Sequence, residues 1–64
     1  MRVVMRRDNT VKEISGKHTV RNILRLLQIN PETVLVVKGG QLLTQDVVVE
    51  ENEEIEIWPV TSGG

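Results

Sequence analysis

Apolar and polar residues alternate over the first six positions of the chain. The apolar set predicted to face a core is Met1, Val3 and Met5, and it alternates with Arg2, Val4 and Arg6. This period of two is that of a half-buried β-strand. Residues 7–10 are turn formers and residues 11–14 run back, which predicts a β-hairpin. Val11 and Ile14 have opposite parity, so either a bulge intervenes or one of the two is exposed.

The next stretch has the period of a helix. Thr19 stands at the N-cap position, where its hydroxyl can accept from a backbone N–H two or three residues on. The apolar residues that follow at i, i+3, i+4 and i+7 are Val20, Ile23, Leu24 and Leu27. Asn30-Pro31 is predicted to end this helix, because proline offers no N–H and pushes the residue before it out of the α region. So short a helix is marginal alone and must pack on a sheet.

The second half of the chain predicts three further strands. Val34–Val37 is β-branched and is typical of an interior strand that is apolar on both faces. Gly39-Gly40 turns the chain into a short strand at 41–43, and Val47–Val49 is either a brief strand or a buried loop. Residues 54–58 alternate again, with Ile55 and Ile57 inward and Pro59 closing the strand.

The order hairpin, helix, strand, short strand, last strand predicts an α+β fold of the ubiquitin-like β-grasp type. A crossover that carries a helix joins parallel neighbours, so the first and last strands should be central and parallel. We therefore expect a four- to five-stranded mixed sheet with one helix packed across one face. The predicted β-grasp domain covers residues 1–60, and residues 61–64 are expected to form a flexible C-terminal Gly-Gly tail.

Composition narrows the function classes. The chain has 64 residues and no cysteine, so it offers no disulfide and no thiolate nucleophile or metal ligand. No stretch approaches the ~20 apolar residues of a membrane span, and the N-terminus lacks the apolar run of a signal peptide. We therefore expect a cytoplasmic protein without a membrane partner.

Charge is unevenly distributed along the chain. Residues 1–38 carry all 8 Lys and Arg against three acidic residues, a balance of +5, and residues 39–64 carry six acidic residues, a balance of −6. Arg2 and Arg6 are predicted to lie beside Glu54 and Glu56 on neighbouring strands, where opposite charges pair. The basic half is thereby offset, and no direct nucleic-acid binding is expected.

Two glycines at the end of the chain are the most specific feature of the sequence. Chain ends are commonly disordered and rich in glycine, and a terminal Gly-Gly can be a linker remnant. Together with the predicted fold, however, the run Pro59-Val60-Thr61-Ser62-Gly63-Gly64 resembles the ThiS/MoaD family of prokaryotic sulfur-carrier proteins, relatives of ubiquitin. Asn30-Pro31-Glu32-Thr33-Val34 after the helix is a weaker, supporting match. The resemblance covers the whole chain.

The resemblance implies a carrier or cosubstrate rather than an enzyme. In that family an E1-like partner adenylates the terminal carboxylate, here that of Gly64, with ATP and Mg, and a partner's persulfide converts it to a thiocarboxylate. Thr61, Ser62 and Gly63 would thread into the partner, and Gly63 and Gly64, which have no Cβ, could pass a narrow slot that excludes side chains. Further implied partners are a sulfur donor, such as a cysteine desulfurase or rhodanese-type protein, and a sulfur-accepting enzyme. No bound cofactor is expected.

The sulfur acceptor is suggested by the segment Leu42–Asp46. Thiamine-pathway carriers usually show a Val-Pro-Arg type segment there, so the chain looks closer to small carriers for tRNA 2-thiouridine formation and to small archaeal modifier proteins. Thiamine thiazole and molybdopterin synthesis stay possible. The alternative function is a ubiquitin-like modifier joined through Gly64 to target lysines.

Other candidate chemical groups are weak in the sequence. His18 is the only histidine and has no cysteine or evident acidic partner, and the paired glutamates are adjacent rather than spaced, so no metal site or catalytic residue is predicted. Strand alternation instead places Val4, Val36 and Trp58 on the sheet face away from the helix, as a partner-contact patch. In the alternative, Trp58 folds over the sheet edge and covers it.

Overall fold

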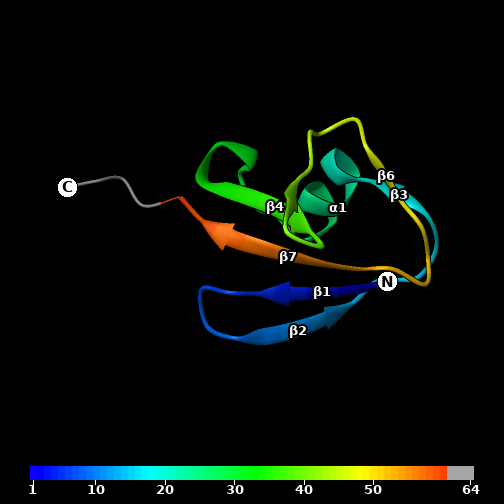
Figure 1. Ribbon diagram of the computed structural model, residues 1–64, viewed down its shortest axis with the longest axis horizontal. Helices are drawn as coiled ribbons and strands as arrows, with labels where there is room; N and C mark the ends of the chain where they lie inside the picture. Colours follow the sequence, from blue (N-terminus) through cyan, green and yellow to red (C-terminus); the bar gives the residue numbers. More distant parts are fainter. Residues whose placement is uncertain (61–64) are drawn as a thin grey trace.

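A five-stranded mixed sheet with one helix on it forms the body of the protein in the computed structural model, which describes residues 1–60 (Figure 1). The strand order is β2-β1-β7-β4-β5. The strands of this sheet are β1 (Arg2–Met5), β2 (Thr10–Glu13), β4 (Val34–Lys38), β5 (Gln41–Leu42) and β7 (Glu54–Pro59). The predicted β-grasp arrangement is confirmed.

The first and last strands lie side by side and parallel at the centre of the sheet, as predicted. Val3 is opposite Ile55, and Met5 is opposite Ile57. Alternation then sends the side chains of Val3, Ile55 and Ile57 to the same face, where all three are buried. Residues of the sheet and the helix meet there in one core, which consists of Met1, Val3, Val20, Ile23, Leu24, Val36, Val49, Ile55 and Ile57.

Helix α1 (Val20–Leu26) begins as predicted and ends earlier than predicted. Thr19 is the N-cap, and its hydroxyl accepts from the Asn22 N–H at 3.2 Å. Gln28 adopts a positive φ of 58°, and the N–H groups of Gln28 and Ile29 donate to Arg25 and Leu24 carbonyls at 3.1 and 2.9 Å. This is the Schellman arrangement, which closes a helix by bonding its last carbonyls. The helix therefore ends without the proline.

Asn30-Pro31 begins a new element rather than ending the helix. The Asn30 side chain accepts from the Glu32 N–H at 3.0 Å and caps the 3-10 helix η1 (Pro31–Thr33). Proline is suited to this first position, because its fixed φ is helical and its missing N–H would have no partner there. Asn30-Pro31 does mark a boundary, but it is the start of η1 and not the end of α1.

A second, two-stranded sheet joins the helix start to the long loop after β5. It consists of β3 (His18–Thr19) and β6 (Val48–Val49), paired antiparallel. Val47–Val49 therefore contains a brief strand, and Val49 is fully buried in the core. Within residues 1–60, no helix is long and apolar enough to cross a membrane.

The parity of the second strand is settled by its end point. Strand β2 stops at Glu13, so Ile14 lies outside it and packs partly buried against the core, whereas Val11 is exposed. The Ile14 N–H donates to the Met1 carbonyl at 2.9 Å. Of the two explanations left open, exposure of Val11 is the one observed.

The predicted placement of Val36 is wrong. Val36 lies opposite Ile57 on β7, faces the helix and retains 4% of its accessible surface. Its neighbours Leu35 and Val37 point to the other face, where Leu35 lies opposite Trp58. Because all residues of Val34–Val37 are apolar, parity could not tell which of them faces inward.

Candidate functional site

The chain leaves the sheet at Pro59 and Val60, which we call the tail root. Pro59 lies opposite Val34 on β4, and the Val60 N–H donates to the Thr33 carbonyl at 2.9 Å. Strand β7 is thus tied to η1 up to its last residues. The predicted site residues beyond it, Thr61, Ser62, Gly63 and Gly64, lie outside the described residues.

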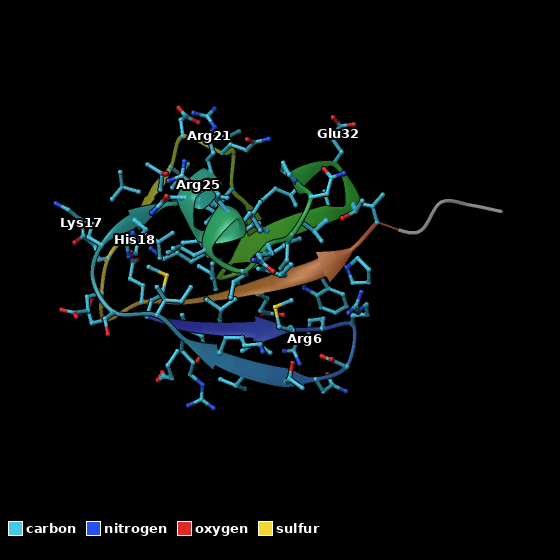
Figure 2. All side chains as sticks on the ribbon, turned by 180° about the vertical axis from the view of Figure 1, so that it is seen from behind. Arg6, Lys17, His18, Arg21, Arg25 and Glu32 are labelled. Carbon is cyan, nitrogen blue, oxygen red and sulfur yellow. The ribbon has the colours of Figure 1, made fainter. Side chains whose placement is uncertain are left out.

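Two other elements reach the same end of the molecule as the tail root. Figure 1 shows the β1–β2 turn and η1 beside the end of β7, and Figure 2 shows Glu32 of η1 there. The Arg6 N–H donates to the Ile57 carbonyl at 2.9 Å, which carries the β1–β7 ladder into the turn. The β1–β2 turn, η1 and the tail root therefore share one end of the described molecule (Figure 1).

The sheet face away from the helix carries an apolar surface beside the tail root. Trp58 is 44% exposed and its cross-strand neighbour Leu35 is 45% exposed. Val4 is half-buried and shares this face, as predicted, whereas Val36 does not. We define the outer patch as Val4, Leu35, Val37 and Trp58, which the strand register places on one face. Sequence reasoning missed Leu35 and Val37.

Two side chains, those of Arg6 and Glu56, hold Trp58 within this patch, and we call the three residues the Trp58 cluster. Arg6 Nε donates to Glu56 Oε1 at 2.9 Å, and the indole N–H of Trp58 donates to the same oxygen at 3.1 Å. The guanidinium of Arg6 also lies 5.6 Å from the centroid of the Trp58 ring, within the range of a cation–π contact. Trp58 therefore lies against neighbours on its own face and does not fold over the sheet edge.

Electrostatics favours the charged form of Glu56. The hydrogen bond from Arg6 lowers the pKa of the Glu56 carboxyl below its ordinary value of 4.5, against an opposing effect of desolvation. Because this pKa is lower in the folded protein, the contacts of the Glu56 carboxylate contribute fully to stability at pH values above 4.5. That contribution is lost only as the pH falls through the lowered pKa. Glu56 is therefore in its charged form at neutral pH, the form that accepts from both Arg6 and Trp58.

Comparison with characterised proteins identifies the family. The chain is 40% identical to the sulfur carrier protein TtuB of Thermus thermophilus, and the alignment covers 100% of both proteins. The chain belongs to the family of sulfur carrier proteins. No protein-family model matches it. The sequence resemblance to carriers of this kind is thus confirmed over the whole length.

Other candidate groups of this sulfur carrier are held by structural contacts. His18 Nε2 lies 2.9 Å from the Ser15 carbonyl, and His18 Nδ1 lies 2.8 Å from the Asn22 amide nitrogen. Since a carbonyl only accepts, Nε2 carries the proton and Nδ1 accepts. His18 also lies at the opposite end of the molecule from the tail root (Figure 2).

The acidic residues near the last turn also have structural partners. Glu53 pairs with Lys38 and accepts the Glu50 N–H at 2.8 Å, and Glu51 accepts the Gly16 N–H at 3.1 Å. Among residues 1–60, no group of three His, Cys, Asp or Glu side chains could hold a metal ion. Within residues 1–60, the tail root and the outer patch are therefore the candidate functional surfaces.

Proposed function

We propose that the protein carries sulfur as a thiocarboxylate on Gly64. The full-length similarity to a named sulfur carrier supports this proposal most directly, and the position of Ser62-Gly63-Gly64 in the sequence, with two residues between it and the tail-root residue Pro59 that ends β7, agrees with it. In this role the protein is a cosubstrate. Partners would recognise its folded domain and bind the Gly64 carboxylate in their active sites.

The chemistry requires activation, because a carboxylate is a poor electrophile. An E1-like partner would use ATP and Mg to join the Gly64 carboxylate to AMP, with release of pyrophosphate. A persulfide on a partner would then attack the acyl carbon and displace AMP. A thiol would cleave the resulting S–S bond and form a disulfide, which leaves the terminal sulfur on Gly64.

The reach of the tail fixes where this partner must bind. Four residues beyond Val60 span about 14 Å when extended, at about 3.4 Å each. The tail root lies at one end of the molecule, opposite the end that carries His18, so a site that holds Gly64 must lie near the tail-root end (Figure 2). The outer patch and η1 are the surfaces closest to that site. We infer that Trp58, Leu35 and Val4 contact the activating partner.

The acceptor that we favour is a tRNA 2-thiolation enzyme. The segment Leu42–Asp46 supports this choice, since it departs from the Val-Pro-Arg type segment of thiamine-pathway carriers. A strain that lacks the protein should then lose 2-thiouridine from its tRNA. Retained 2-thiouridine together with a thiamine or molybdenum-cofactor requirement would redirect the assignment.

The test of the proposed function is the intact mass of the protein. The protein is incubated with the E1-like enzyme of the same organism, ATP, Mg, and a cysteine desulfurase supplied with cysteine. Its mass should rise by the difference between sulfur and oxygen. Omission of ATP is the control and should leave the mass unchanged. An unchanged mass in the complete mixture would contradict sulfur carriage.

The contact role of the outer patch is tested by Trp58→Ala. Large aromatic side chains at the centre of an interface often contribute about 2 kcal/mol or more to binding. We expect a loss of at least about tenfold in affinity for the E1-like partner, measured by calorimetry, because 1.4 kcal/mol corresponds to about tenfold. Since Trp58 is nearly half exposed, the melting temperature should change much less. Equal losses in folding and binding would remove the outer patch as a contact.

A further inference from the structure

We propose that Glu56 and Arg6 are positioning residues, which fix the orientation of the Trp58 indole so that Trp58 and Leu35 meet the activating partner as one preformed apolar contact. This inference rests on the proposed function. It assigns a role to two charged residues that do not belong to the apolar contact and that hold its central side chain.

The geometry of Glu56 supports this role. One oxygen, Oε1, accepts from both Arg6 and Trp58, at 2.9 and 3.1 Å. The three residues come from adjacent strand positions: Glu56 and Trp58 are two apart on β7, and Arg6 follows the neighbouring parallel strand β1. The carboxylate therefore fixes the indole nitrogen and the guanidinium at one point, and the guanidinium in turn lies over the ring.

The contacts of Glu56 and Arg6 with Trp58 determine which part of the indole is free to bind a partner. Its N–H is already bound to Glu56, and Arg6 covers part of the ring. The remaining exposed surface is apolar and lies beside Leu35, its neighbour across the β4–β7 ladder. The partner surface that fits it is an apolar pocket, with no acceptor required for the indole N–H. A ring that is held before binding loses less conformational freedom when the partner docks.

The chain contains a control ion pair on the same sheet face, away from Trp58. Arg2 on β1 lies directly opposite Glu54 on β7 and pairs with it at 3.6 Å, with both side chains 59% exposed. Among residues 1–60, the hydrogen bond and the cation–π contact of Trp58 involve Glu56 and Arg6, and neither Arg2 nor Glu54 takes part in them. Glu54→Ala removes the same kind of group from the same face of the same strand and leaves the Trp58 cluster in place.

The orientation of Trp58 can be observed directly. The chain has one Trp and no Tyr or Phe, so the near-ultraviolet circular dichroism arises from Trp58 alone. We expect Glu56→Ala to reduce this band strongly. Glu56→Gln keeps an acceptor oxygen for the indole and should retain part of it, and Glu54→Ala should keep the wild-type band. Far-ultraviolet spectra verify that all variants are folded.

The effect on recognition is measured with the E1-like enzyme by ATP–pyrophosphate exchange. Glu56→Ala should raise the KM for the carrier about two- to tenfold, the ratio expected when one side chain must be ordered on binding. The kcat should stay near the wild-type value, since Gly64 is unchanged. Glu56→Gln should give an intermediate KM, and Glu54→Ala a wild-type KM.

Two results would overturn the inference. A wild-type near-ultraviolet band in Glu56→Ala would show that Glu56 does not hold the ring. An equal rise in KM for Glu54→Ala and Glu56→Ala would show that general surface charge, rather than the orientation of Trp58, affects docking. If the wild-type protein is not activated at all, the proposed function fails instead, and the spectra still decide whether Glu56 and Arg6 position Trp58.

Discussion

Removal of Gly64 is expected to abolish activation by the E1-like enzyme and to leave the melting temperature nearly unchanged. The shortened chain still ends in a glycine carboxylate, but this carboxylate is withdrawn by about 3.4 Å when the tail is extended. A misplacement of about 1 Å can already cost about 10²-fold in rate, so we expect a loss of at least that size. The buried core ends at Ile57, which is why folding should not depend on Gly64.

The measurements are ATP–pyrophosphate exchange and thermal unfolding of the shortened chain. Lys17→Ala is the control, because Lys17 lies at the opposite end of the molecule from the tail root, and this variant should retain the activity (Figure 2). Activity of the shortened chain close to the wild-type level would contradict a site built for the Gly64 carboxylate. Higher-mass conjugates in cell extracts that disappear with Gly64 would instead point to a protein modifier.

Ile23→Ala should cause the largest loss of stability among single core substitutions on the helix. Ile23 is fully buried between α1 and the sheet, and such truncations typically cost about 2–5 kcal/mol. Small proteins are stable by only about 5–15 kcal/mol, so this is a large fraction of the total. The free energy of unfolding, measured by urea denaturation, should fall accordingly.

The control for this substitution lies on the same helix. Leu26 is 54% exposed, and Leu26→Ala should change the free energy of unfolding by no more than about 0.5 kcal/mol. Because both substitutions replace a four-carbon side chain in α1, they differ mainly in burial. Similar losses at Ile23 and Leu26 would mean that the helix does not pack on the sheet through the face described above.

The elements with a mixed apolar and polar pattern were predicted well. Ile55 and Ile57 alternate with glutamates, so their inward direction followed from the sequence and is confirmed. Thr19 has a hydroxyl at the position where a helix needs an acceptor, and it caps α1. In both cases the local chemistry of a residue has one structural solution, which a short stretch of sequence reveals.

The sequence predicted fewer details of the remaining elements, such as the predicted strand whose residues are all apolar. All residues of Val34–Val37 are apolar, and only the register with β7 decides that Val36 is buried and that Leu35 is exposed beside Trp58. The end of α1 at Leu26 was also missed, for a different reason: glycine is the usual signal for the positive φ that closes a helix, and the sequence has glutamine at position 28. The small sheet of β3 and β6 joins residues about thirty positions apart, and no local pattern indicates such a pairing.

Periodicity, capping and order along the chain were enough to determine the fold class, the central pair of parallel strands and the helix start. The folded arrangement was needed to show which apolar residues form the outer patch and that Glu56 joins Arg6 to Trp58. Those facts depend on strand register, and register is fixed by contacts between segments about twenty residues apart for β4 and β7 and about fifty residues apart for β1 and β7.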